Sequence, residues 1–368
     1  MKIAFLKFAG LGIGGVERYL QSIALLVNAE GHEVDYYYTN SAPIVGVDWT
    51  HPPNDPLREE ALKNAGINLI KVKVGYKNYD PTAPQGEVWQ DSDIFEKFDE
   101  NQYDLLFIAG NGKADYPASQ FRNVKTVYSV HGDNVYDQDN IIKSLLICEW
   151  QSKRWLSNGG NQSKLEIVPP IVEIPETYPT NFRQKYKIPK DAFVFGMHQR
   201  DDPSIFSPVS LMAFSQLQDP SNYMVILGGS QRHRDLVRSW PEDKRDRVVF
   251  LDSTAHKSLI HSFLHGIDVY AHSRLDGEVC STAIVEAMAH GKVIISCPGT
   301  NNGHQEQIAD CGFFCSSLEE YISSMEALRT DKKMYKRLSQ KTKDRYNNLY
   351  SYSCVKEKVA TLLYNLAS

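Results

Sequence analysis

Residues 2–38 read KIAFLKFAGLGIGGVERYLQSIALLVNAEGHEVDYYY. An apolar run over 2–9 is typical of a buried strand, and the glycine-rich loop after it leads into residues 16–30, where apolar side chains recur at helical spacing. Gly31 is placed to end that helix, and 33–38 has the composition of a second strand. A strand, a glycine loop, a helix and a strand in this order form one βαβ unit, which predicts a parallel sheet.

The alternation of short apolar strands with helical patterns continues along the chain and is interrupted by a proline-dotted stretch over 167–189, which is typical of a linker. A chain of 368 residues is long enough for two domains. We therefore predict two Rossmann-like, doubly wound α/β domains over 1–180 and 181–350, followed by a final helix over 351–368. The later strands are expected at 68–74, 103–109, 124–130, 144–148, 193–197, 223–227, 248–251, 268–271 and 293–296.

The composition is that of an ordinary soluble globular protein, with 42% hydrophobic and 23% charged residues. A formal net charge of −5 argues against nucleic acid as a partner, because nucleic-acid-binding domains are usually basic. Lys7 interrupts the first apolar run, unlike a signal peptide, and no apolar run approaches the ~20 residues of a membrane-spanning helix. We expect a cytoplasmic protein, with a weak peripheral membrane contact left open. Cys311 and Cys315 lack the second half of a zinc site, so free thiols are expected.

The segment with the most chemistry is DGEVCSTAIVEAMAHGKVII, residues 276–295. Glu278 falls in a loop after a predicted strand, and Glu286 falls inside a predicted helix whose N-cap would be Ser281 or Thr282. The free N–H groups at that helix start favour an anionic group such as a diphosphate. The two carboxylates could accept hydrogen bonds from sugar hydroxyls. The alternative is that both glutamates are ordinary surface charges.

This segment resembles the Glu-x7-Glu signature of the retaining glycosyltransferases with the GT-B fold, in particular their large fourth family. The resemblance covers essentially the whole chain. It implies two Rossmann-like domains that face each other across a cleft, with the C-terminal helix crossing back to the first domain. Further similar segments are Gly14-Gly15-Val16-Glu17-Arg18, Val130-His131-Gly132, Ile167-Val168-Pro169-Pro170 and Gly196-Met197-His198-Gln199-Arg200.

The resemblance implies transfer of a sugar from a nucleoside-diphosphate sugar to a hydroxyl acceptor (a glycan, a lipid-linked molecule or a small molecule) with retention of the anomeric configuration. It implies no metal and no cofactor. The acceptor would bind mainly to the first domain, across the cleft. Glu278 would lie beside the donor sugar, Glu286 would hold the ribose hydroxyls, and Arg200 would neutralise the diphosphate. His131 would hydrogen-bond the sugar. The donor-binding set is completed by Gly14, Gly15, Arg274, Val279, Cys280, Ser281 and Thr282.

The chain departs from the family pattern at two points. Arg200 is followed by DDPSIF where the family has a lysine, so a second cation for the diphosphate, such as Arg274, must come from elsewhere. Residues 278–281 read EVCS where the family has Glu-x-Phe-Gly, which predicts a different sugar pocket. These departures leave two alternatives open. One is a non-catalytic protein that binds sugar nucleotides or glycans, and the other is an epimerase or phosphorylase on the same fold.

Three other patterns suggest an NAD site, a metal site and a charged surface helix. Residues 10–15 match the G-x-G-x-x-G fingerprint of NAD-binding proteins, but the acidic residue at the expected distance, Asp35, lies within a strand and not at its end. Asp91 and Asp93 match a metal-binding Asp-x-Asp motif, but the apolar spacing after them predicts a helix N-cap. The charged run 331–346 predicts a solvated amphipathic helix.

Overall fold

The computed structural model describes residues 1–7, 11–12, 14–39, 55–75, 91–112, 118–132, 134–172, 174–254 and 256–367. The chain divides into two compact units, Met1–Pro169 with Val355–Ser368, and Pro170–Cys354. The predicted boundary at 180 therefore lies too late. The reason is that the start of the proline-dotted stretch packs into the second unit, where Val172 is part of the core.

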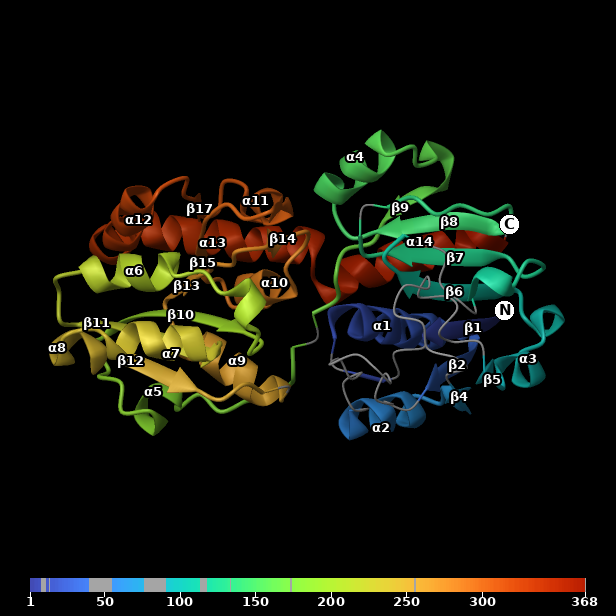
Figure 1. Cartoon of the computed structure of the whole chain (residues 1–368), viewed down its shortest axis with the longest axis horizontal. Helices are drawn as coiled ribbons and strands as arrows, with labels where there is room; N and C mark the ends of the chain where they lie inside the picture. Colours follow the sequence, from blue (N-terminus) through green and yellow to red (C-terminus); the bar gives the residue numbers. More distant parts are fainter. Residues whose placement is uncertain are drawn as a thin grey trace. The chain divides into compact units, whose positions relative to one another are not determined.

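The first unit is built on a parallel sheet whose strands follow the order β3-β2-β1-β6-β7-β8-β9 (Figure 1). Its first three elements form the predicted βαβ unit, and Gly31 ends the helix with a φ of 84°. The elements are β1 (Lys2–Lys7), α1 (Gly15–Ala29), β2 (Glu33–Thr39), α2 (Pro56–Asn64), β3 (Asn68–Val72), β4 (Val74–Gly75), β5 (Asp91–Ser92), α3 (Ile94–Lys97), η2 (Glu100–Gln102), β6 (Leu105–Gly110), η3 (Ala118–Gln120), β7 (Thr126–Val130), β8 (Ile141–Leu146), α4 (Glu149–Ser157), η4 (Gln162–Lys164) and β9 (Leu165–Ile167).

The second unit repeats the design with a parallel sheet in the order β12-β11-β10-β13-β15-β17. The elements are α5 (Phe182–Lys185), β10 (Phe193–Gln199), η5 (Pro203–Ile205), α6 (Val209–Gln216), β11 (Asn222–Gly228), α7 (Gln231–Arg238), α8 (Glu242–Arg245), β12 (Val248–Leu251), α9 (Lys257–Gly266), β13 (Val269–Ala271), β14 (Gly277–Glu278), α10 (Thr282–Ala289), β15 (Val293–Ser296), β16 (Asn301–Asn302), α11 (Gly303–Ile308), β17 (Phe313–Phe314), α12 (Leu318–Thr330), α13 (Lys332–Leu349) and α14 (Tyr352–Ala367).

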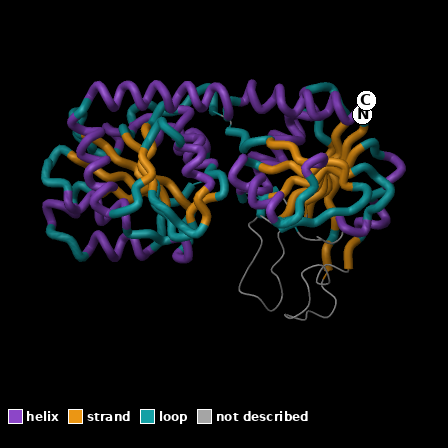
Figure 2. The backbone as a smooth tube through the Cα atoms, turned by 90° about the horizontal axis from the view of Figure 1, so that it is seen from above, coloured by secondary structure: helices purple, strands orange, loops and turns teal. Residues whose placement is uncertain are grey.

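Both faces of the second sheet are covered by helices, which is why its strands are apolar runs without polar alternation (Figure 2). Successive residues of β10 enter two different cores. Val194 packs with residues of α9 and α10, whereas Phe195 and Met197 pack with residues of α6 and α12. Such doubly covered sheets bind ligands beyond the carboxyl ends of their strands.

The order of each sheet also creates a topological switch point, because the chain leaves the central strand in one direction and returns on its other side. In the second unit this point lies between β10 and β13, and in the first unit between β1 and β6. The crevice outside the strand ends at a switch point is the usual ligand position in this architecture. The loops that follow β10 and β13 are therefore the ones that can form a site.

The C-terminal helices confirm two expectations. The chain crosses back to the first unit within α14, where Lys356 forms an ion pair of 3.0 Å with Glu30 at the end of α1. Helix α13 is amphipathic, burying Leu338, Thr342 and Tyr346 on one face. Among the described helices, none is long and apolar enough to cross a membrane.

The helix start predicted at residues 91–93 differs in detail from the expectation. Asp93 precedes α3, but its carboxylate accepts the N–H of Lys73 at 2.7 Å and pairs with Lys97 at 2.8 Å. The hydroxyl of Ser92 accepts the N–H of Ile94 in its place, at 3.2 Å. Asp93 therefore joins the helix to the preceding strand segment and does not cap it.

Candidate functional site

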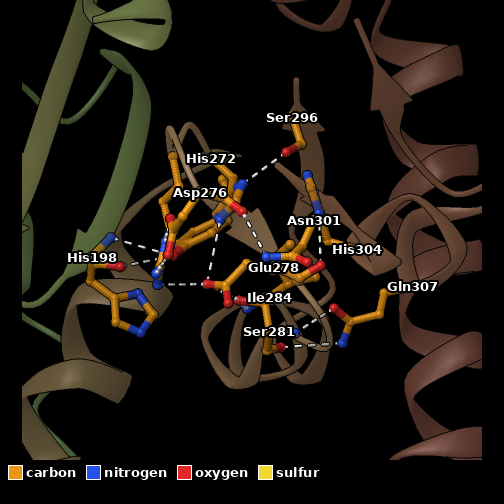
Figure 3. A network of polar contacts seen from close by, with 12 residues as sticks. His198, His272, Asp276, Glu278, Ser281, Ile284, Ser296, Asn301, His304 and Gln307 are labelled. Atoms are coloured by element: carbon orange, nitrogen blue, oxygen red, sulfur yellow. Dashed lines mark hydrogen bonds and ion pairs between the residues drawn. The ribbon is translucent and has the colours of Figure 1, made fainter. Parts of the chain in front are cut away.

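The loop after β13 is held in one conformation by a short pairing with a second loop of the same unit (Figure 3). Strand β14 pairs with β16, and the N–H of Asn301 donates to the carbonyl of Asp276 at 2.9 Å. Gly277 has a φ of 61°, and a Cβ added to it would lie 1.8 Å from the Asn301 carbonyl oxygen. Only glycine satisfies both conditions, so this residue fixes the position of Glu278 that follows it.

Glu278 carries a carboxylate that is largely buried and surrounded by polar groups. Its side chain is 18% exposed, and Oε1 accepts from Nη1 of Arg274 at 2.8 Å and from the hydroxyl of Ser281 at 3.1 Å. Nε2 of His272 lies 3.8 Å from the same oxygen, which is longer than a hydrogen bond. Burial raises the pKa of Glu278, but the adjacent His272 and Arg274 lower it by more, so the pKa lies below its ordinary value. The carboxylate is therefore ionised at neutral pH.

Arg274 is engaged on two sides within the same loop. Its Nε and Nη2 donate to the two carboxylate oxygens of Asp276 at 2.9 and 2.6 Å, and its Nη1 donates to Glu278. The side chain is 17% exposed. One positive charge thus lies between two negative charges in a partly buried position.

Ser281 is the N-cap of α10, which decides between the two predicted caps. Its hydroxyl accepts the N–H of Ile284 at 3.4 Å. Its backbone is held by Gln307 of α11, which accepts the Ser281 N–H at 2.6 Å and donates to the Ser281 carbonyl at 3.2 Å. Gln307 is buried, and no sequence pattern pointed to it. The exposed Thr282 begins the helix, after the partly buried Val279 and the buried Cys280.

Glu286 does not face solvent, which excludes its interpretation as an ordinary surface charge. Its side chain is 13% exposed, and Oε2 lies 2.8 Å from Nε2 of His198 near the end of β10. The hydroxyl of Tyr270 in β13 donates to the carbonyl of His198 at 3.1 Å and so ties the two central strands together. Glu286 and His198 therefore meet at the switch point between β10 and β13. His198 was missed as a site residue, although it lies two positions before the predicted Arg200.

Arg200 lies just beyond the end of β10 with its side chain 67% exposed. Its Nη2 pairs with Asp202 at 3.0 Å. Asp202 also accepts the N–H of Ser204 and so caps the short helix η5. Ile205, which lies in the segment expected to supply a second cation, is buried. The cationic contribution of this loop is therefore one exposed guanidinium.

The predicted residues of the first unit lie at the equivalent edge of the first sheet. His131 follows β7, and its Nε2 lies 3.0 Å from the hydroxyl of Ser129 while its ring packs edge-on against Tyr19. Burial and the nearby Lys7 lower the pKa of His131 to about 3, so the ring is neutral at physiological pH. Gly15 begins α1, and no described atom lies within 4 Å of a Cβ built on it.

Gly14 is the N-cap of α1, next to the side chain of Glu17. A Cβ on Gly14 would lie 2.0 Å from Oε2 of Glu17, the end of a flexible side chain that folds back over the helix start. Gly10 and Ile13 of the glycine loop lie outside the described residues.

The sequence also offered an NAD site at Asp35 and a zinc site at the cysteines. Asp35, the candidate ribose ligand of an NAD site, is buried within β2, where its oxygens accept from Tyr103 at 2.6 Å and Asn68 at 2.8 Å. Both carboxylate oxygens of Asp35 therefore bind side chains of the first unit, which argues against a role in NAD binding. The six cysteines are free thiols, and within the described ranges no three His, Cys, Asp or Glu side chains are grouped as ligands of a metal ion.

The second unit matches a known protein family, and the whole chain resembles solved structures. Residues 180–345 match the family described as glycosyl transferases group 1. Among curated protein sequences, no relative matches the chain. Similar solved structures include Anabaena HepE in complex with UDP-glucose, at 18% identity and a TM-score of 0.73 over 99% of this chain and 100% of that chain.

Two further solved structures resemble the chain over its whole length. Sucrose-phosphate synthase from Thermosynechococcus elongatus has 15% identity and a TM-score of 0.74, covering 100% of both chains. A glycosyltransferase from Rickettsia africae has 16% identity and a TM-score of 0.73, covering 100% of this chain and 98% of that one. At these identities the likeness establishes the fold, which is the GT-B fold with its two Rossmann-like units.

Proposed function

We propose that the protein transfers a sugar from a nucleoside-diphosphate sugar to a hydroxyl acceptor, with retention of the anomeric configuration and without a metal ion. The match of residues 180–345 to the family described as glycosyl transferases group 1 supports this proposal. One observation carries the proposal. Glu278 and Glu286, the two carboxylates of the Glu-x7-Glu pattern, lie beyond the switch point of the second sheet, and both are held by polar partners instead of facing solvent.

The proposed donor lies against the second unit. Glu286, oriented by His198, accepts hydrogen bonds from the ribose hydroxyls, and Glu278 accepts one from a hydroxyl of the sugar. The N–H groups at the start of α10 and the guanidinium of Arg200 face the diphosphate. Both are electropositive, so they stabilise the charge that develops on the leaving nucleoside diphosphate.

Retention is proposed through attack of the acceptor on the face that the diphosphate leaves. The acceptor oxygen forms the new glycosidic bond while the bond to the diphosphate breaks, and the acceptor proton passes to a phosphate oxygen of the leaving group. Glu278 is held by Arg274 and Ser281 as a hydrogen-bond acceptor. His131, neutral because of its burial, is proposed to hydrogen-bond the sugar, and Gly15 to leave room for a phosphate.

The structural neighbour HepE was solved with UDP-glucose, so this compound is the first donor to test. Thermal unfolding is measured with UDP, GDP, ADP and their glucose conjugates, in the presence of EDTA. A ligand at ~100 times its dissociation constant adds about 2.7 kcal/mol to the stability. Glu286→Gln should lose that gain, whereas Glu242→Gln, which changes an exposed glutamate of the same unit, should keep it.

Transfer is then followed with the stabilising donor and a panel of hydroxyl acceptors, and the anomeric configuration of the product is assigned by NMR. A product with inverted configuration would remove the retaining part of the proposal. Loss of transfer in EDTA would contradict the proposal that transfer needs no metal ion. If no nucleoside diphosphate stabilises the protein, the assignment of the donor site is wrong.

A second candidate is a protein that binds the donor without transferring its sugar. The observation that favours it is the limited positive charge at the site, where Ile205 is buried and Arg274 is already paired with two carboxylates. Such a protein would be stabilised by the donor and lose that gain in Glu286→Gln, but would release no nucleoside diphosphate with any acceptor.

A further inference from the structure

Arg274 has an arrangement unlike that of a phosphate-binding arginine. A guanidinium that neutralises a diphosphate needs a positive charge that neighbouring carboxylates do not already compensate. In this loop three of the five N–H groups of Arg274 donate to carboxylates, because Nε and Nη2 contact the two oxygens of Asp276 and Nη1 contacts Glu278. With one positive and two negative charges, the group of three side chains has a net charge of −1.

The bidentate contact with Asp276 fixes the plane of the guanidinium. Asp276 is itself anchored, because its carbonyl accepts from the backbone N–H of Asn301 at 2.9 Å and from the side chain of Asn301 at 3.2 Å. A guanidinium held on one edge by a fixed carboxylate can present its remaining edge in only one direction. That edge meets Oε1 of Glu278 at 2.8 Å.

The other polar groups near Glu278 do not duplicate this contact. Ser281 donates to the same oxygen at 3.1 Å but also caps α10. His272 stops at 3.8 Å, with Nδ1 held 2.8 Å from the hydroxyl of Ser296. His304 reaches the backbone carbonyl of Glu278 at 3.4 Å and not its carboxylate. Arg274 is therefore the cation whose direction determines where the Glu278 carboxylate points.

We propose that Arg274 is a positioning residue, anchored by Asp276, that aims Glu278 at the donor sugar and plays no part in binding the diphosphate. The inference rests on the proposed function of the site and replaces the expectation that Arg274 supplies the second cation. It separates two parts of donor recognition. Arg274 governs affinity for the sugar, and the nucleoside diphosphate is bound without it.

The test compares binding of UDP, which lacks the sugar, with binding of UDP-glucose by calorimetry. GDP or ADP and its glucose conjugate replace this pair if that nucleotide stabilises the wild type. In Arg274→Gln we expect the dissociation constant of UDP to stay within about twofold while that of UDP-glucose rises about tenfold, the loss typical of one hydrogen bond to a charged group. The turnover number of transfer should fall with it. Arg274→Lys, which keeps the charge, should restore part of both losses.

The matched control is Arg329→Gln, which breaks a partly exposed arginine–aspartate pair of 2.6 Å with Asp219 elsewhere in the same unit. It should leave both dissociation constants unchanged. If Arg274→Gln does not fold, Asp276→Asn serves in its place, because it removes the anchor and leaves Glu278 paired. It should show the same selective loss in smaller measure.

Each outcome decides a different claim. Equal weakening of UDP and UDP-glucose would show that Arg274 binds the diphosphate, and unchanged binding of both would show that it does not position Glu278. Either result overturns the inference and leaves the proposed function intact. Failure of the wild type to bind any nucleoside diphosphate would overturn the proposed function and this inference with it.

Discussion

Nε2 of His198 lies 2.8 Å from Oε2 of Glu286, although the two residues are 88 positions apart in the sequence. The contact exists because β10 and β13 are neighbours in the sheet and α10 begins just beyond the end of β13. Both side chains are nearly buried, with 11% and 13% exposure. A carboxylate in such a position needs a hydrogen-bond donor to be stable.

His198→Phe should therefore weaken binding of the nucleotide without removing a direct ligand. The ring volume is kept, but Glu286 loses the hydrogen bond from His198 that helps to orient it, and a hydrogen bond to a charged group contributes about 1.5–3 kcal/mol. We expect the dissociation constant of UDP to rise roughly tenfold. Calorimetry with UDP measures this. His198→Gln, which retains a donor, should lie closer to the wild type, and equal affinity of all three proteins would contradict the role of His198.

The stability of the protein should fall as the pH is lowered from neutrality. Burial lowers the pKa of His304 to about 4, and the pKa of His290 to about 3, where His261 adds to the effect. The unfolded chain takes up protons at these residues near pH 6.5, but the folded protein does not. In this window the unfolded state binds more protons, so stability is fully present above about pH 6.5 and falls as the pH drops toward 4.

The measurement is the free energy of unfolding at a series of pH values from 7.5 to 4.5. Each histidine that stays neutral in the fold contributes a slope of about 1.4 kcal/mol per pH unit at most. His290→Gln should reduce the slope, and His256→Gln, which changes an exposed histidine before α9, should not. An unchanged slope in His290→Gln would show that proton uptake by His290 does not cause the loss of stability in acid.

Much of the fold follows from local patterns, because strands covered on both faces are short apolar runs with little polar alternation. The strands β12 and β15 begin and end where they were predicted, at 248–251 and 293–296. The prediction at 144–148 is wrong in its position, because β8 spans Ile141–Leu146. The charged Lys143 made a strand at this position look unfavourable from the sequence. In the structure its amino group donates to the carboxylate of Glu166 in β9 at 2.9 Å, so the strand tolerates the charge.

The candidate site could be predicted only in part. Glu278, Glu286 and Ser281 stand close together in one motif, so the sequence alone places them on a loop, in a helix and at its cap. His198 and Gln307 come from other elements, and their contacts depend on the order of strands in the sheet and on the turn that brings α11 beside α10. A spacing rule within one segment carries no information about partners that only the tertiary fold supplies.

Gln307→Leu should destabilise the second unit and loosen the start of α10. The side chain is buried and holds both the N–H and the carbonyl of Ser281. Removing it leaves two buried backbone groups without these partners, at a cost of about 1–3 kcal/mol. Denaturant unfolding measures this loss. Gln305→Leu, a change on the exposed side of the same helix, is the control and should cost much less.

Gly277→Ala should damage the site more than an ordinary glycine substitution does. Two effects combine, because the backbone has a φ of 61° and the added Cβ would meet the Asn301 carbonyl at 1.8 Å. The first effect alone costs on the order of 1 kcal/mol. Gly66→Ala isolates the first effect, since Gly66 has a φ of 86° with no described atom within 4 Å of the added Cβ.

The second effect of Gly277→Ala forces β14 away from β16 and moves Glu278. We therefore expect transfer with UDP-glucose to fall at least about tenfold in Gly277→Ala and to be unchanged in Gly66→Ala. Kinetics on both variants measure the difference, and equal activity of the two would show that the β14–β16 pairing does not position Glu278.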